Sequence, residues 1–156
     1  MKKRIGKAAL WLCFLLYSGV MLWLLFGRSR YDTLPSYDQP MSLNLIPFRT
    51  IRMYLHILSS STNAYSLRHA AINLLGNVGL FLPLGFFLPA VFSGLRGFWR
   101  TLFCTVLLIS AVEVVQILTR VGVCDIDDLL LNALGSGIGF LIYRILNPKK
   151  KQPKKE

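Results

Sequence analysis

The stretch LFCTVLLISAVEVVQIL, residues 102–118, decides the fold class of this chain. Its length is close to the roughly 20 residues that an α-helix needs to cross the hydrocarbon core of a membrane. Glu113 and Gln116 interrupt a run that is otherwise largely apolar. An ionisable side chain at membrane depth is costly, so such a residue marks a functional site by default. We therefore expect a membrane-spanning helix that carries a polar site.

Three further stretches have the same apolar character, namely residues 8–26, 70–92 and 129–146. Hydrophobic residues make up 54% of the chain, which is more than the core of a soluble protein of 156 residues requires. We predict an all-α membrane protein, a bundle of four transmembrane helices. Pro83 and Pro89 are expected to kink the second helix or to end it near Phe87.

The net charge of +11 is concentrated beside the predicted spans. Most basic residues precede the first span, separate the second from the third, or end the chain, which is the positive-inside pattern if both termini are cytoplasmic. We thus predict a cytoplasmic basic N-terminus (1–7), a basic cytoplasmic tail (147–156) and two external segments (27–69 and 119–128). Nucleic acid is not an expected partner, because the tail has no aromatic residue to stack on bases. Membrane lipids are an expected partner, because the basic tail can bind anionic lipid headgroups.

In this orientation, polar residues of three helices gather near the outer face of the membrane. Spacings of three and four residues place each group on one side of its helix. The groups are His69, Asn73 and Asn77 on the second helix, Glu113, Gln116 and Arg120 on the third, and Asp125, Asp128 and Asn132 on the fourth. We predict a site at which these three faces meet.

Structural explanations compete with this site. Amide side chains often join membrane helices, at about 0.6 kcal/mol per pair, which could account for Asn73, Asn77, Gln116 and Asn132. Glu113 could form an ion pair with Arg120, Arg68 or His69, and Asp127 or Asp128 could cap a helix. A divalent cation held by the oxygens of Asp125, Asp127 and Asp128 is a further alternative, although the regular loop of a calcium site is missing.

An amphipathic helix is predicted in the external segment, over about residues 47–58. Pro47 suits the first helical position. The spacing places Phe48, Ile51, Leu55 and Leu58 on one face, and Arg49, Arg52 and His56 on another. We expect this helix to lie in the outer membrane interface, where its basic face would meet lipid phosphates or an anionic ligand.

Glycine pairs indicate close helix packing. Gly135 and Gly139 form a GxxxG pair on the fourth helix, and Gly76 and Gly79 lie on the second. Small residues at this spacing let helix backbones approach each other. We expect the second and fourth helices to pack together, although a GxxxG pair is also typical of a dimer face. The oligomeric state stays open.

Several short motifs occur in a characteristic order between residues 44 and 143. They are Asn44-Leu45-Ile46-Pro47-Phe48, Asn73 with Gly76-Asn77, Phe81-Leu82-Pro83-Leu84-Gly85-Phe86, Ser110 with Glu113 and Gln116, and finally Arg120, Asp125, Asp128, Asn132, Gly135 and Gly139. In these motifs the chain resembles the VanZ-like membrane proteins. The first span and the lysine-rich tail lie outside the motifs.

The resemblance implies a multi-pass protein of the bacterial cytoplasmic membrane that acts in the cell envelope. The founding member of that family is associated with low-level resistance to teicoplanin and related lipoglycopeptides. We therefore expect an outward-facing site that lowers susceptibility to such antibiotics. A membrane-embedded hydrolase or transferase acting on a lipid-linked envelope substrate is one alternative, and a non-catalytic interaction protein is another.

Within this hypothesis the polar residues divide into two roles. The carboxylates would supply a base or hold a metal, and the remaining polar residues would bind a lipid-linked envelope precursor or a lipoglycopeptide. The candidate catalytic residues are Glu113, Asp125 and Asp128. The candidate ligand-binding residues are Arg49, Arg52, Arg68, Asn73, Asn77, Gln116, Arg120 and Asn132.

Overall fold

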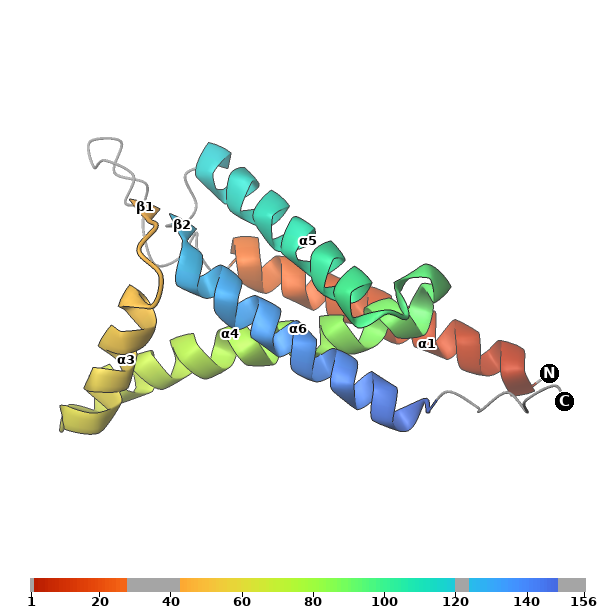
Figure 1. The fold of residues 1–156 in the computed structure, drawn as a ribbon, viewed down its shortest axis with the longest axis horizontal. Coiled ribbons are helices and arrows are strands. Elements are labelled where there is room, and N and C mark those ends of the chain that lie inside the picture. The colour runs from red at the N-terminus through yellow and green to blue at the C-terminus, as the bar shows by residue number, and fades with distance from the viewer. Residues whose placement is uncertain (1, 28–42, 120–123, 149–156) are drawn as a thin grey trace, which may run out of the picture.

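The computed structural model describes residues 2–27, 43–119 and 124–148 (Figure 1). Over these ranges the chain is almost entirely helical. The helical elements are α1 (Lys2–Leu22), the π-helical turn η1 (Trp23–Gly27), α3 (Arg49–Ser60), α4 (Ala64–Val91), the 3-10 turn η2 (Ser93–Leu95), α5 (Phe98–Thr119) and α6 (Ile126–Leu146). Within the described ranges, α1, α4, α5 and α6 are long and apolar enough to cross a membrane. The predicted four-span helical fold is confirmed.

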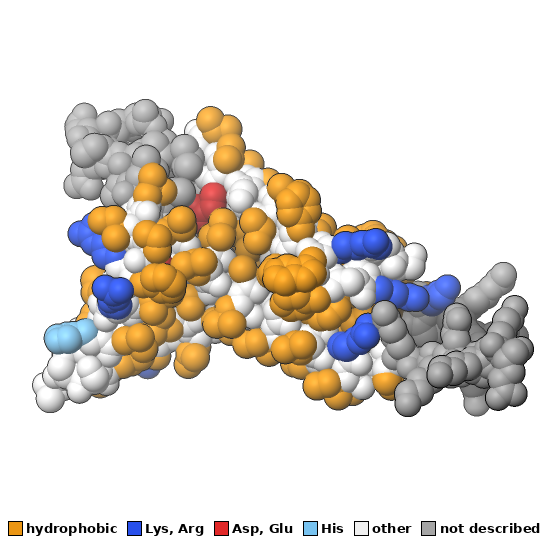
Figure 2. Space-filling view, in the orientation of Figure 1, with side chains coloured by type: hydrophobic (Ala, Val, Ile, Leu, Met, Phe, Trp, Pro, Cys, Tyr) orange, Lys and Arg blue, Asp and Glu red, His pale blue; other side chains and the backbone are white. Residues whose placement is uncertain are grey.

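The four long helices run between two ends of the bundle (Figure 1). At one end α1 begins, α4 ends, α5 begins and α6 ends; we call it the basic end, because Arg96, Arg100 and Arg144 lie there. At the other end α5 ends and α6 begins; we call it the acidic end, after Asp125, Asp127 and Asp128. Figure 2 shows hydrophobic side chains over the middle of one face and Lys and Arg side chains toward both ends. This distribution suits a protein surrounded by lipid.

Helices α4 and α6 cross in close contact, as the GxxxG pair predicts. A Cβ atom added at Gly135 would collide with the backbone of Val78, and one added at Gly139 would collide with the backbone of Leu82. Both glycines are buried. The GxxxG pair therefore serves a helix contact within this chain.

The matching glycine on α4 is not one of those predicted. Gly79 has open space around its Cα atom, and a Cβ added at Gly76 would meet only a side chain of its own helix. Gly85 fills this role instead, because a Cβ there would collide with the backbone of Ser136. The Ser136 hydroxyl in turn shares a buried hydrogen bond of 2.8 Å with the Thr105 hydroxyl, which ties α5 to α6.

The remaining core lies between α1, α4 and α5. It is built from Met21, Phe81, Leu84, Leu88 and Ile109, all of which are buried. The Tyr17 hydroxyl on α1 donates a hydrogen bond of 2.6 Å to the backbone carbonyl of Leu80 on α4. The apolar contact between α1 and α4 therefore includes one hydrogen bond.

Helix α4 continues through both of its prolines. It runs over 28 residues to Val91, so the alternative that it ends near Phe87 is wrong. At about 1.5 Å per residue its length is about 42 Å, which exceeds a hydrocarbon core of about 30 Å. A helix of this length either tilts in the membrane or extends beyond the hydrocarbon.

Helix α3 lies two residues further along the chain than predicted, and it faces the protein with different side chains. It begins at Arg49 rather than Pro47. Ile51, Tyr54 and Ile57 are partly buried, whereas Leu55 and Leu58 of the predicted apolar face are exposed. The residues of the predicted apolar face therefore have different surroundings. Ile51 packs toward the protein, while Leu55 and Leu58 are exposed and can contact lipid.

Candidate functional site

Asp127 fastens the start of α3 to the start of α6. Its side chain is fully buried, and Oδ1 accepts a hydrogen bond of 2.6 Å from the backbone N–H of Phe48. Oδ2 accepts bonds from the N–H groups of Thr50 (2.7 Å) and Ile51 (3.1 Å). The first N–H groups of a helix have no partner within it, so this carboxylate caps α3 from a different element. Its geometry is that of a structural residue.

The capped turn has an unusual backbone. Phe48 adopts the left-handed conformation (φ 63°) and offers no side-chain cap of its own. A bulky residue with positive φ is rare and must be held by its surroundings. The bond from its N–H to Asp127 is one such restraint.

Asp125 binds the same segment from the neighbouring position. Its carboxylate accepts hydrogen bonds from Asn44 Nδ2 (3.1 Å to each oxygen) and from Thr50 Oγ1 (2.6 Å). It also caps α6, because Oδ1 accepts a bond of 2.9 Å from the N–H of Asp127. Both oxygens of this candidate catalytic residue are therefore engaged in structural contacts.

Two short extended segments complete this joint. β1 (Leu43–Asn44) pairs in parallel with β2 (Cys124–Asp125), with Asn44 opposite Asp125. Sequence reasoning missed the pairing, because two residues show no alternating pattern. The joint holds the start of α3 beside the start of α6.

Asp128 differs from both neighbours. Its Oδ1 accepts a hydrogen bond of 2.6 Å from Asn77 Nδ2 on α4, and within the described residues no other hydrogen bond to its side chain is recorded. The side chain is partly buried. Of the three aspartates, Asp128 retains the most capacity to accept a bond from a bound molecule.

Tyr54 places α3 beside the same carboxylate. Burial raises the pKa of the Tyr54 hydroxyl, and the negative charges of Asp128 and Asp125 raise it further. Asp128 thus lies within electrostatic range of α3 and in direct contact with α4. Helices α3, α4 and α6 contribute to its surroundings, whereas the sequence predicted that faces of α4, α5 and α6 would meet there.

Asn132 lies one helical turn beyond Asp128 on α6. It is 5% exposed, and its Oδ1 is buried without a hydrogen-bond partner among the described residues. Buried polar atoms in native proteins are nearly always paired, with water if not with protein. The Oδ1 atom therefore provides an acceptor for a water molecule or a ligand group.

The other predicted amides and acids occupy different positions. Gln116 Nε2 donates a bond of 3.0 Å to the carbonyl of Leu25, which joins α5 to η1. Asn73 Nδ2 donates a bond of 2.9 Å to the carbonyl of His69 on its own helix. Glu113 is partly buried on α5, with Oε2 shielded from solvent. Arg120 lies outside the described residues.

The candidate basic residues lie at the surface around these groups. Arg49, Arg52 and Arg68 are all exposed. The ring of His69 lies 5.9 Å from the ring of Tyr54, measured between centroids. Helix α4 therefore contacts α3 at Tyr54, the residue whose pKa is raised by burial and by Asp128 and Asp125. Exposed cations therefore lie on α3 and α4, the two helices that contribute Tyr54 and Asn77 to the surroundings of Asp128.

A shared metal site receives no support from the side-chain geometry. Within the described ranges, no group of three or more His, Cys, Asp or Glu side chains is placed to hold one ion. Asp127 faces the α3 backbone and Asp128 faces Asn77, so the aspartates turn to different partners. The predicted cation at Asp125, Asp127 and Asp128 stays a hypothesis that the chain's own geometry does not favour.

Comparison with known proteins identifies the family. The VanZ/LLP1 family matches residues 14–147, so the similarity reaches into α1, beyond the motifs found in residues 44–143. The chain is also 26% identical to Protein VanZ of Enterococcus faecium over 140 residues, which cover 89% of this chain and 76% of that protein. No solved structure matches it. With four helices that can span a membrane and a family match over most of its length, the chain belongs to the VanZ/LLP1 family.

Proposed function

We propose that this protein resides in a bacterial cytoplasmic membrane with its acidic end outside, and that it lowers susceptibility to teicoplanin-type lipoglycopeptides. The family relationship supports this setting. The observation that carries the site is the half-buried carboxylate of Asp128, which accepts a hydrogen bond from Asn77, together with exposed arginines on the adjoining helices α3 and α4. The target is an envelope component, such as a lipid-linked precursor, within reach of the outer membrane surface.

The charges indicate how such a component would be bound. Arg49, Arg52 and Arg68 offer guanidinium groups at the surface, and guanidinium pairs well with phosphate oxygens. Asp128 and Asn132 Oδ1 lie deeper and accept hydrogen bonds, which suits hydroxyl or amide donors of the same ligand. An amphiphilic molecule with an anionic headgroup and neutral donors meets both requirements.

A hydrolase or transferase acting on such a lipid is the second candidate. It is favoured by the asymmetry of the aspartates, since Asp128 accepts the fewest hydrogen bonds from the described residues and could take a proton from an attacking hydroxyl or water. A non-catalytic role requires only that the site bind its ligand. The two differ in whether the envelope lipids change chemically.

Susceptibility testing provides the experiment. A teicoplanin-sensitive Gram-positive host would express the wild-type protein, the Asp128→Asn variant or an empty vector, with membrane abundance matched by immunoblot. We expect the wild type to raise the inhibitory concentration above that of the vector. No increase would contradict the proposal.

Mass spectrometry of extracted membrane lipids from the same strains separates the two candidate roles. A lipid species that appears only with active protein, and disappears with Asp128→Asn, would support an enzyme that uses Asp128. Unchanged lipids together with raised resistance would support binding alone.

A further inference from the structure

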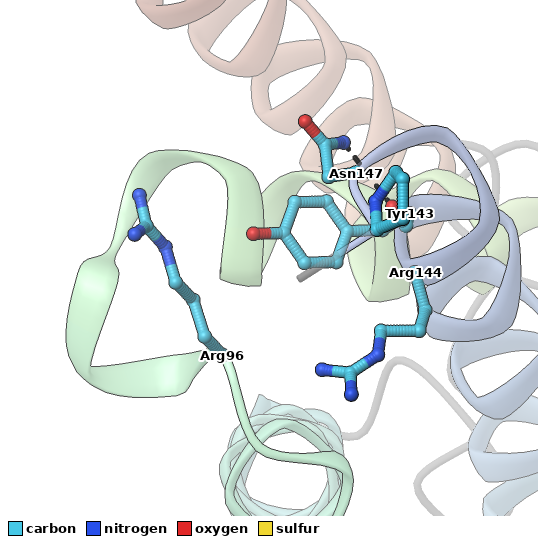
Figure 3. A pocket seen from close by; sticks show the side chains of 5 residues that line it. Arg96, Tyr143, Arg144 and Asn147 are labelled. Atoms are coloured by element: carbon cyan, nitrogen blue, oxygen red, sulfur yellow. Dashed lines mark hydrogen bonds between the residues drawn. The ribbon is translucent and has the colours of Figure 1, made fainter. Parts of the chain in front are cut away.

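A second polar site lies at the basic end, far from the aspartates. It is a cavity of about 260 Å³ lined by Arg96, Tyr143, Arg144, Asn147 and Pro148 (Figure 3). Arg96 follows η2 in the connection between α4 and α5, whereas the other residues belong to the end of α6. The cavity therefore forms only when the bundle is assembled.

Among the described residues, the cavity carries positive charge and its lining has no acidic side chain. Figure 3 shows the Arg96 and Arg144 side chains on either side of the Tyr143 ring, with the Tyr143 hydroxyl directed toward Arg96. The sequence has no Asp or Glu over residues 92–112 or 129–155. Neither guanidinium forms an ion pair with a residue in the described part of the chain. Two cations that share a cavity in this way favour a bound anion.

The third arginine of this end serves as a contrast. Arg100 Nη1 approaches the backbone carbonyl of Gly94 at 3.4 Å, and Arg100 does not line the cavity. A general need for positive charge at this end would make all the basic residues equivalent. Only Arg96 and Arg144 of these three arginines line the cavity.

The floor of the cavity is held in place. Tyr143 is 8% exposed, and its ring packs against those of Phe86 and Phe140 at centroid distances of 6.1 Å. Asn147 Nδ2 donates a bond of 3.1 Å to the Tyr143 carbonyl, which closes the end of α6. The Tyr143 hydroxyl is thus a fixed donor between two forked donors, an arrangement suited to the oxygens of a phosphate.

Apolar surface next to the cavity indicates where the rest of the ligand lies. Ile145 and Leu146, in the last turn of α6, are 76% and 66% exposed. A cavity of this size accommodates a headgroup but not acyl chains. Cavities lined by basic residues at the ends of transmembrane helices lie at the depth of lipid phosphates.

We propose that Arg96, Arg144 and the Tyr143 hydroxyl bind the phosphate of an anionic phospholipid, whose acyl chains lie along the exposed apolar end of α6. This binding is independent of the function proposed for the acidic end. It would anchor the turn between α4 and α5 to the end of α6.

Native mass spectrometry of the detergent-purified protein, titrated with phosphatidylglycerol or phosphatidylcholine, tests the proposal. The test variant is Arg96→Gln/Arg144→Gln. The matched control is Lys7→Gln/Arg100→Gln, which also removes two positive charges from the basic end but leaves the cavity intact. Tyr143→Phe removes one donor while keeping the buried ring, and circular dichroism would verify that each variant is folded.

The wild type is expected to prefer phosphatidylglycerol. The test variant should lose roughly tenfold or more in affinity, the effect of one or two charge-assisted hydrogen bonds, whereas the control should stay within about twofold. Tyr143→Phe should lose roughly threefold, as one neutral hydrogen bond would give. Equal losses in test and control variants, or no preference for the anionic lipid, would overturn the proposal. So would equal displacement by glycerol phosphate, which would assign the cavity to a soluble phosphate.

Discussion

Aspartates that are neighbours in the sequence here contact different parts of the molecule. Asp125 caps its own helix and holds Asn44, Asp127 caps α3, and Asp128 contacts α4. Local reasoning predicts that aspartates before an apolar helix cap it. It could not assign Asp127 to α3, because that contact joins residues 79 positions apart in the chain. Of the three aspartates, we therefore retain Asp128 as the candidate functional residue, because it accepts the fewest hydrogen bonds from the described residues.

Loss of the Asp127 side chain should detach the start of α3. The Asp127→Ala variant leaves three backbone N–H groups without their acceptor, which should cost about 2 kcal/mol or more. Thermal unfolding in detergent would report the loss, and hydrogen exchange of residues 48–51 would locate it. The control is Ser59→Ala, an exposed position whose hydroxyl bonds within its own helix. Unchanged exchange at residues 48–51 would contradict the assigned cap.

At the scale of the elements, the positions of the helices were predicted from the sequence more accurately than the contacts between them. Apolar length was sufficient to find four spans and periodicity to find α3. The GxxxG pair on α6 was found from its spacing, but its partner on α4 was placed at Gly76 and Gly79 instead of Gly85. The register of one helix against another depends on their crossing geometry, which the sequence of a single helix does not contain.

Replacing a glycine at the α4 and α6 crossing should separate the helices. In Gly139→Ala the new methyl group would meet the backbone of Leu82 and Phe86, so we expect a loss of about 2 kcal/mol. Gly79→Ala is the matched control, since that glycine faces open space and alanine favours the helix. The midpoint of thermal unfolding in detergent should fall for the first variant and stay level or rise for the second. Equal midpoints would disprove the close crossing.

At the scale of the whole molecule, charge separates the two ends of the bundle. All the acids of the described ranges lie on α5 or at the start of α6, whereas Arg96, Arg100 and Arg144 gather at the basic end. From the positive-inside rule we propose that the basic end faces the cytoplasm. With four spans, both ends of the chain would then lie on that side.

Reporter fusions can test this orientation. Green fluorescent protein joined after residue 148 should fluoresce, and alkaline phosphatase inserted at residue 62, between α3 and α4, should be active. Both results follow from a cytoplasmic basic end, because each reporter functions on one side of the membrane only. The opposite pair of results would place the acidic end inside and remove its access to envelope components.

The most direct test of the functional account is the teicoplanin susceptibility of a sensitive host that expresses Asp128→Asn. Thr119→Ala is the control, because this exposed hydroxyl lies at the same end of the bundle and donates to the carbonyls of Val115 and Gln116 in its own helix. Membrane abundance would be matched by immunoblot and folding by thermal unfolding. The account predicts that Asp128→Asn abolishes the resistance given by the wild type while Thr119→Ala retains it. Full resistance in a folded Asp128→Asn protein would contradict the assignment of function to this carboxylate.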